Sequence, residues 1–103
     1  MSDAKELFIR ASETVPEAEA GQMFGKPCYK IGGKAFVCFF QDEMVFKLTG
    51  DAHARALALD GAQLFDPSGK GRAMKEWVQV PFTSRDQWAT LAGQAVAYVG
   101  GRG

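Results

Sequence analysis

The residues best suited to chemistry in this 103-residue chain lie in one short glycine-rich segment, Pro67-Ser68-Gly69-Lys70-Gly71-Arg72. Glycines let backbone N–H groups approach an anion closely, and the Lys70 and Arg72 side chains add positive charge. The segment is not a P-loop, because the Gly-x-x-x-x-Gly-Lys-Ser/Thr spacing is missing and no long helix follows it. Two interpretations remain: a solvated hairpin loop and an anion-binding loop.

Basic residues are concentrated in the middle of the chain, although the formal net charge is zero. Residues 1–21 hold two bases and five acids, whereas residues 22–75 hold eight bases and five acids, so these segments carry net charges of −3 and +3. In the strand pattern described below, Lys30 and Lys47 share a sheet face with Phe39, and nucleic-acid surfaces combine cations with aromatic rings in this way. An overall neutral chain is atypical of dedicated nucleic-acid-binding proteins. The candidate contacts to an anion or a nucleic acid are Lys30, Lys47, Lys70, Arg72 and Lys75.

An apolar strip on the same predicted face suggests a second use for it. Val37, Phe39 and Val45 lie on two neighbouring strands, and together they exceed the apolar surface that a small monomer usually leaves in water. The strip is therefore a candidate interface for a second copy of the chain or for a protein partner. Alternatively, a terminal helix covers it, and Lys30 and Lys47 extend their charged ends outward at the rim.

The positions of these side chains follow from a predicted three-stranded antiparallel meander between Met23 and Leu48. Gly32-Gly33 suits a two-residue turn with positive φ angles, which predicts that Ile31 pairs with Lys34 and Tyr29 with Phe36. A three-residue loop, Gln41-Asp42-Glu43, then keeps the apolar residues of the next strand on the same side by pairing Phe40 with Met44. The predicted core face carries Tyr29, Ile31, Phe36, Cys38, Phe40, Met44, Phe46 and Leu48. The reverse face carries Cys28, Lys30, Ala35, Val37, Phe39, Val45 and Lys47.

The two cysteines and the single histidine do not form a recognisable site. In the predicted register Cys28 lies opposite Val37 and points away from Cys38, so we expect two reduced thiols that cannot meet disulfide geometry. The spacing of the cysteines and His53 does not fit a zinc site. No carboxylate pair and no Ser-His-Asp set can be assembled from spacing, so we predict no catalytic residue, no metal and no cofactor.

The predicted elements give the fold class. Those outside the meander are, in chain order, a helix capped by Ser2 that runs to about Thr14, a helix over Ala52–Leu59 capped by Asp51, a short strand at Leu64-Phe65, a strand over Met74–Val80, and a helix capped by Thr83 or Ser84 that ends before Gly100. This order predicts an α+β fold: an antiparallel sheet of about five strands, a meander plus a hairpin, with N- and C-terminal helices. The chain length suits a single domain over residues 1–103.

Several short motifs are informative as a set: Met23-Phe24-Gly25, Gly32-Gly33-Lys34, Met44-Val45-Phe46-Lys47-Leu48, Phe65-Asp66-Pro67 and Gly69-Lys70-Gly71-Arg72-Ala73-Met74-Lys75-Glu76-Trp77-Val78. Together they resemble the TfoX N-terminal-domain family over roughly Gly21 to Val99, and the last block is the most specific part. The resemblance implies an α+β fold related to the frataxin-like, double-wing MmcQ/YjbR proteins. It also implies a regulatory role, because the family takes its name from a regulator of DNA-uptake competence. The family has no established catalytic residues, so the resemblance implies none here.

The sequence shows no catalytic constellation, and the resemblance implies a regulatory or adaptor domain. We therefore expect a non-enzymatic domain, transcription- or competence-related, that acts through protein or nucleic-acid contacts. No segment approaches the roughly 20 apolar residues of a membrane span, and the first residues lack the layout of a secretion signal, so we expect a cytoplasmic location. The resemblance implies that this cytoplasm is bacterial. The alternative is a homodimeric protein that binds a small anionic ligand, such as phosphate, at the loop with Lys70 and Arg72.

Overall fold

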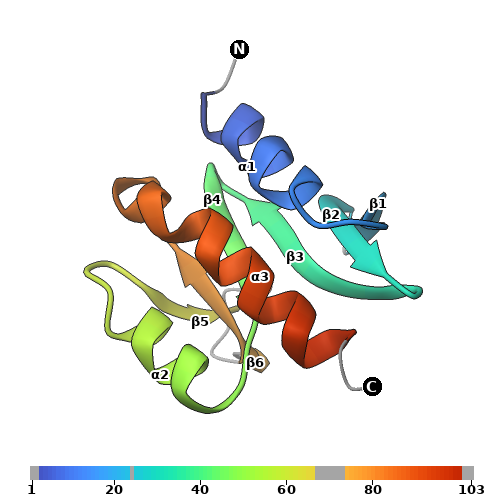
Figure 1. The fold of residues 1–103 in the computed structure, drawn as a ribbon. Coiled ribbons are helices and arrows are strands. Elements are labelled where there is room, and N and C mark those ends of the chain that lie inside the picture. Colours follow the sequence, from blue (N-terminus) through green and yellow to red (C-terminus); the bar gives the residue numbers. More distant parts are fainter. Residues whose placement is uncertain (1–2, 24, 67–73, 101–103) are drawn as a thin grey trace.

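The computed structural model of the chain describes residues 3–23, 25–66 and 74–100. The elements in chain order are α1 (Asp3–Glu13), β1 (Glu19–Met23), β2 (Lys26–Ile31), β3 (Lys34–Phe40), β4 (Glu43–Lys47), α2 (Gly50–Leu57), β5 (Gln63–Phe65), β6 (Met74–Val80), the 3-10 helix η1 (Phe82–Gln87) and α3 (Trp88–Val99). The strands form one antiparallel sheet with the spatial order β1-β2-β3-β4-β6-β5 (Figure 1). The predicted α+β class, antiparallel sheet and terminal helices are therefore confirmed.

The sheet has six strands among the described residues rather than about five. The additional strand, β1, has the sequence Glu-Ala-Gly-Gln-Met, which lacks the β-branched and aromatic residues that mark strands. It lies at the sheet edge and pairs with β2 along its whole length, from Glu19 opposite Lys30 to Met23 opposite Lys26. Its pairing with β2, rather than its own composition, identifies it as a strand.

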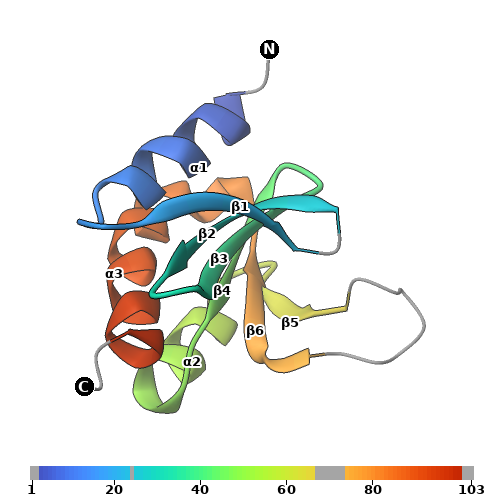
Figure 2. The ribbon, with the colours of Figure 1, turned by 90° about the vertical axis from the view of Figure 1, so that its right-hand side faces the viewer.

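The α-helices α1, α2 and α3 all lie on one side of the sheet, as Figure 2 shows. In α3, Trp88, Leu91, Ala92 and Ala95 recur at helical spacing and are all buried, so this helix packs its apolar stripe on the sheet. Phe8 of α1 joins the same core and packs against Phe39 at a ring-centroid distance of 5.2 Å. We call this side of the sheet the helix side.

The predicted helix boundaries needed small corrections. α2 begins at Gly50 after the N-cap residue Thr49, so Asp51 lies within the first turn instead of capping the helix, and its carboxylate there still faces the positive end of the helix dipole. The last helix is not capped by Thr83 or Ser84, because the N-cap residue of α3 is Gln87. Non-helical backbone angles at Ser84 (φ −106°, ψ 28°) interrupt η1, and regular α-helix begins only at Trp88.

The first hairpin has the predicted turn but contains an extra residue. Ile31 pairs with Lys34 across Gly32-Gly33, whose φ angles of 58° and 82° favour glycine. The register then shifts: Lys30 lies opposite Ala35 and Tyr29 lies opposite Val37, so Phe36 has no partner in β2. A residue inserted in this way is a β-bulge, and it reverses the face on which every later residue of β3 lies. The predicted pair of Tyr29 with Phe36 is therefore wrong.

The second connection is also shorter than predicted. Phe40 pairs with Glu43, which leaves a two-residue turn of Gln41 and Asp42 with φ angles of 52° and 64°. Positive φ at both central positions defines the primed turn that matches the twist of antiparallel strands. The predicted three-residue loop is wrong because the bulge at Phe36 had already moved Phe39 to the helix side, where it pairs with Met44.

These two changes redistribute the side chains of the meander. Phe36, Val37, Phe39, Met44, Phe46 and Leu48 all join the helix-side core. Cys38, by contrast, lies on the reverse side, in a second buried cluster that consists of Cys28, Cys38, Val45, Phe65 and Trp77. We call this the reverse-side cluster. Cys38 lies directly opposite Cys28, so the prediction that the two thiols lie on opposite faces is wrong.

Candidate functional site

Three lysines share the reverse side of the sheet. Lys26 and Lys30 flank Cys28 at two-residue intervals in β2, and alternate residues of a strand point to the same face. Lys47 lies directly opposite Trp77, a member of the reverse-side cluster. We call Lys26, Lys30 and Lys47 the lysine face. Two of them, Lys30 and Lys47, were predicted from the sequence to share a face, whereas Lys26 was not included.

Two of the lysine side chains lie over aromatic rings, and the third lies over a glycine of the neighbouring strand. The Lys26 Nζ atom is 5.2 Å from the centre of the Phe40 ring, and the Lys47 Nζ atom is 6.0 Å from the centre of the Trp77 ring. The stem of Lys30 passes over Gly21, where a Cβ atom would lie 3.2 Å from the lysine Cε atom. Lysine stems thus cover apolar surface while their ammonium groups carry the charge, and cation–π attraction fixes two of them.

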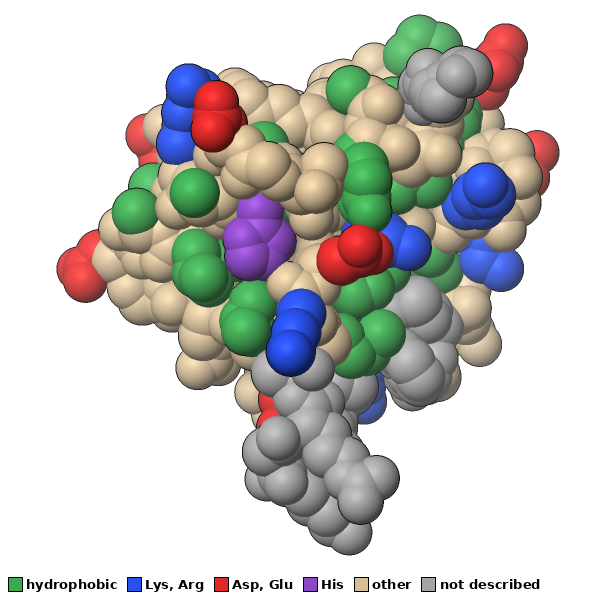
Figure 3. Space-filling view, turned by 90° about the horizontal axis from the view of Figure 1, so that it is seen from below, with side chains coloured by type: hydrophobic (Ala, Val, Ile, Leu, Met, Phe, Trp, Pro, Cys, Tyr) green, Lys and Arg blue, Asp and Glu red, His purple; other side chains and the backbone are tan. Residues whose placement is uncertain are grey.

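Lys47 also begins a chain of polar contacts that leads to the helix layer. Its Nζ atom lies 3.7 Å from Glu76 Oε1, and the hydroxyl of Tyr98 in α3 donates to Glu76 Oε2 at 2.8 Å. The hydrogen bond to Glu76, followed by weaker burial and charge effects, raises the pKa of Tyr98 above its ordinary value. Figure 3 shows this end of the molecule, where acidic and basic side chains lie close together among apolar ones.

The remaining predicted contacts do not extend this surface within the described residues. Lys75 is exposed, and its backbone carbonyl accepts a hydrogen bond from His53 Nε2 at 2.7 Å, so the histidine ties α2 to β6. Because a carbonyl only accepts, Nε2 carries the proton. Lys70 and Arg72 lie outside the described residues.

The predicted apolar interface does not form an exposed strip. Val37 and Phe39 lie on the helix side, whereas Val45 belongs to the reverse-side cluster, because the bulge at Phe36 reverses the alternation of β3. Val37 and Val45 are fully buried, and Phe39 is 9% exposed. The helix layer covers Val37 and Phe39 because both lie on the helix side. The alternative that a terminal helix covers the face with Lys30 and Lys47 is wrong, since the α-helices lie on the other side of the sheet. These three residues are therefore core residues that leave no exposed apolar strip.

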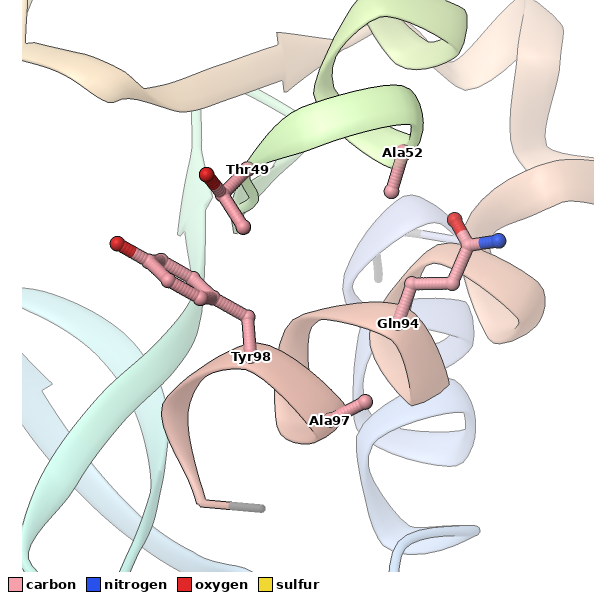
Figure 4. A pocket seen from close by; sticks show the side chains of 5 residues that line it. All are labelled: Thr49, Ala52, Gln94, Ala97 and Tyr98. Atoms are coloured by element: carbon pink, nitrogen blue, oxygen red, sulfur yellow. The ribbon is translucent and has the colours of Figure 1, made fainter. Parts of the chain in front are cut away.

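A pocket that sequence reasoning missed lies between α2 and α3 (Figure 4). Its volume is about 540 Å³, and it is lined by Thr49, Ala52, Gln94, Ala97 and Tyr98. The lining is mostly apolar, with one amide and one aliphatic hydroxyl as hydrogen-bonding groups besides the phenol. Tyr98 is the most exposed large apolar side chain among the described residues, at 37%. No motif marks this pocket, because its walls come from two helices whose packing is set by the tertiary fold.

The Tyr98 ring forms one wall of the pocket, and a residue outside the pocket lining fixes its position. Its hydroxyl is bound by Glu76 of β6, 22 positions earlier in the chain, and Glu76 is in turn paired with Lys47 of β4. An exposed aromatic side chain that is fixed at its far end loses less rotamer freedom when a ligand packs on its face. The pocket and the lysine face are thus linked through a single carboxylate.

Within the described residues, no group of three or more His, Cys, Asp or Glu side chains is arranged to hold a metal ion. The same part of the chain contains no helix that is both long enough and apolar enough to span a membrane. No family model, no curated protein and no solved structure matches this chain.

Proposed function

We propose that this protein is a non-enzymatic regulatory or adaptor domain of TfoX N-terminal type that binds an acidic segment of a partner protein on the lysine face. The observation that supports the proposal most is the position of Lys26, Lys30 and Lys47 on the sheet side opposite the α-helices. Ammonium groups gathered on one face attract carboxylates and orient an approaching acidic partner.

The geometry favours an acidic protein segment over a nucleic acid. Binding of single-stranded nucleic acid relies on bases stacked on open aromatic faces. Here Phe39 is buried on the helix side, Trp77 is 6% exposed, and Lys26 lies over Phe40. The zero net charge of the chain also provides little general attraction for a polyanion. A nucleic acid could then bind only through its phosphates, without stacked bases, and DNA is therefore one of the ligands to be tested.

The spacing of the lysines suits an extended segment. Lys26 and Lys30 are four residues apart in one strand, which places their Cα atoms roughly 13 Å from each other. Lys47 lies two strands away from β2, which corresponds to roughly 10 Å across the sheet. Lys47 already has Glu76 as a partner, but both side chains are partly exposed, and an exposed pair of this kind is weak enough for another carboxylate to replace it.

Binding of an oligoglutamate peptide and of single-stranded and duplex DNA at low salt tests the proposal, with NMR shifts as the readout. We expect oligoglutamate to shift resonances of β2 and β4. The double variant Lys26→Glu/Lys30→Glu should weaken this binding more than about tenfold, since two attractive contacts become repulsive. The matched control Lys34→Glu/Arg55→Glu changes the net charge equally, with both exposed positions away from the lysine face.

Two outcomes would overturn the proposal. Equal weakening by the control variant would mean that net charge, rather than the lysine face, determines binding. DNA shifts on the lysine face without oligoglutamate shifts would replace an acidic protein segment with a nucleic acid as the partner.

A second candidate function is the binding of a small ligand in the pocket between α2 and α3. The lining contains no cationic side chain, so it favours a neutral and largely apolar ligand over the phosphate that the loop sequence suggested. Thermal-shift screening of neutral aromatic compounds against inorganic phosphate tests this alternative. A ligand at about 100 times its Kd stabilises the protein by about 2.7 kcal/mol. Ala97→Leu should reduce the shift by occupying part of the pocket, and an unchanged shift in this variant would place the ligand elsewhere.

A further inference from the structure

The bulge at Phe36 brings the only two cysteines of the chain face to face. Cys28 of β2 and Cys38 of β3 are direct Cα partners in an antiparallel pair. Opposed residues in such pairs have Cα atoms about 4.5 to 5.5 Å apart, which lies within the 4.4 to 6.8 Å that a disulfide spans. Without the bulge Cys28 would face Val37, and the two sulfur atoms would lie on opposite sides of the sheet.

The surroundings of the two thiols are apolar and close-packed. Cys28 is 1% exposed and Cys38 is fully buried, and Val45, Phe65 and Trp77 complete the cluster. The Cys38 thiol has only a weak hydrogen bond, to the Phe39 carbonyl at 3.9 Å. Both sulfurs are free. The two thiols therefore lie in one buried apolar cluster, on residues that are direct cross-strand partners.

Electrostatics also couples the pair. Burial, followed by the neighbouring Cys28, raises the pKa of the Cys38 thiol to about 11, whereas the hydrogen bond to the Phe39 backbone and the charge of Lys26 act in the opposite direction. Burial likewise raises the pKa of Cys28, and Lys30 opposes it. Both thiols are therefore protonated at neutral pH, and exchange reactions that need a thiolate proceed slowly there and faster as the pH rises.

We propose that Cys28 and Cys38 form a dithiol that converts reversibly into an intramolecular disulfide across β2 and β3. The oxidant is a low-molecular-weight disulfide. The thiolate of one cysteine attacks a sulfur of this disulfide, which breaks its S–S bond, releases one small thiol and leaves a mixed disulfide on the protein. The second thiolate then attacks the protein sulfur of the mixed disulfide and releases the second small thiol. Each cysteine gives its proton to a departing thiolate, so two protein thiols are oxidised and one disulfide is reduced.

This inference does not depend on the proposed function. It requires only the observed register and the absence of a third metal-binding group near the two thiols in the described part of the chain, where a zinc site would need more ligands. The disulfide would connect the two strands beside the bulge, beneath the side chains of Lys26 and Lys30.

The test is equilibration of the full chain with mixtures of reduced and oxidised glutathione, followed by acid quenching, alkylation of free thiols and mass spectrometry. We expect the wild type to lose two hydrogens, to lose both alkylation sites together, and to show a direct link between the peptides of Cys28 and Cys38. Dithiothreitol should restore both thiols. Cys28→Ala and Cys38→Ala are the matched controls, since neither variant has the second thiol that converts the mixed disulfide into the intramolecular one.

Because burial slows the reaction of the thiols, the oxidised fraction is measured from two starting states to establish that equilibrium has been reached. One sample starts reduced and native, and the other is oxidised in concentrated urea and then refolded. We expect both to reach the same oxidised fraction, with disulfide formation at least about tenfold more favourable in the native chain than in urea. Three results would overturn the proposal: a stable glutathione adduct on the native wild type, a disulfide that is less favourable in the native chain than in urea, or an oxidised chain that refolds without the native NMR spectrum.

Discussion

The two faces of the sheet come from the same strands, but they are buried in different ways. On the helix side, large side chains such as Phe46, Phe36 and Trp88 form one continuous core beneath α1 and α3. On the reverse side a smaller cluster surrounds Cys28 and Cys38, and lysine stems lie at its margin. The difference shows how one inserted residue divides the side chains of an apolar strand between the helix-side core and the side on which the lysines lie.

The largest expected effect is the loss of stability when a buried phenylalanine is replaced by alanine, and it should differ between the helix-side core and the reverse-side cluster. Phe46→Ala should lower the free energy of unfolding by about 4 to 5 kcal/mol, because the cavity is enclosed by helices and sheet. Phe65→Ala should cost about 3 kcal/mol, because this residue belongs to the smaller cluster and to a three-residue edge strand whose neighbours can relax. Urea unfolding measures both values. An equal or larger cost for Phe65→Ala would mean that the reverse-side cluster is the main core.

Substitutions of Cys38 test whether water is excluded from the reverse-side cluster. Cys38→Ser places a hydroxyl in the buried cluster and should destabilise the protein by about 2 kcal/mol. Cys38→Ala, which removes the sulfur without adding a polar group, should cost about 1 kcal/mol. If urea unfolding finds the serine variant as stable as the wild type, then water reaches Cys38 and the cluster is not closed.

The two-residue turn between β3 and β4 allows a smaller change, and this one should stabilise the protein. Gln41 has a φ angle of 52°, a conformation that asparagine adopts more readily. Gln41→Asn should therefore raise the free energy of unfolding by about 0.5 kcal/mol. The same substitution at Gln63, in strand β5, is the control and should be neutral or slightly destabilising. A loss of stability in Gln41→Asn would contradict the two-residue turn.

The smallest expected effects are the ionisations of the two tyrosines. Burial, followed by the Glu13 carboxylate, raises the pKa of Tyr29, and the hydrogen bond to Glu76 raises that of Tyr98. Since folding favours the neutral phenols, their contribution to stability is complete below about pH 10 and is lost as the pH rises through the higher pKa values of the folded state. Ultraviolet titration should find both above 10.

Single carboxylate substitutions assign these two titrations. Glu76→Gln should lower only the value of Tyr98, and Glu13→Gln only that of Tyr29, because each carboxylate accepts a hydrogen bond from one phenol. If the pKa of Tyr98 is unchanged in Glu76→Gln, then the hydrogen bond that holds the Tyr98 ring at the wall of the pocket does not form in solution.

Sequence patterns predicted the parts of this fold that depend on local chemistry. The Gly32-Gly33 turn, the strand over Met74–Val80 and the buried stripe of α3 all follow from turn requirements and from apolar periodicity. The bulge could not be predicted in the same way. From Ala35 to Phe40 the residues are all apolar, so both possible alternations bury a plausible set and the pattern does not choose between them.

The candidate sites show the same division. Lys30 and Lys47 were placed on one face because they lie on strands whose direction the sequence indicates, and the structure adds Lys26 to the same face. The paired cysteines depend on the bulge, and the pocket at Tyr98 depends on how α3 packs beside α2. Both arise from contacts between distant segments, which composition and spacing do not encode.

The register of β2 and β3 determines which side chains share the lysine face and whether the cysteines can react with each other, so it is the most direct point to test. A proton NMR experiment that records cross-strand nuclear Overhauser effects between backbone protons distinguishes the two registers. The structure predicts effects between Cys28 and Cys38 and between Tyr29 and Val37. Effects between Cys28 and Val37 and between Tyr29 and Phe36 would show that the bulge is absent, and they would contradict both the division of the two faces and the proposed disulfide.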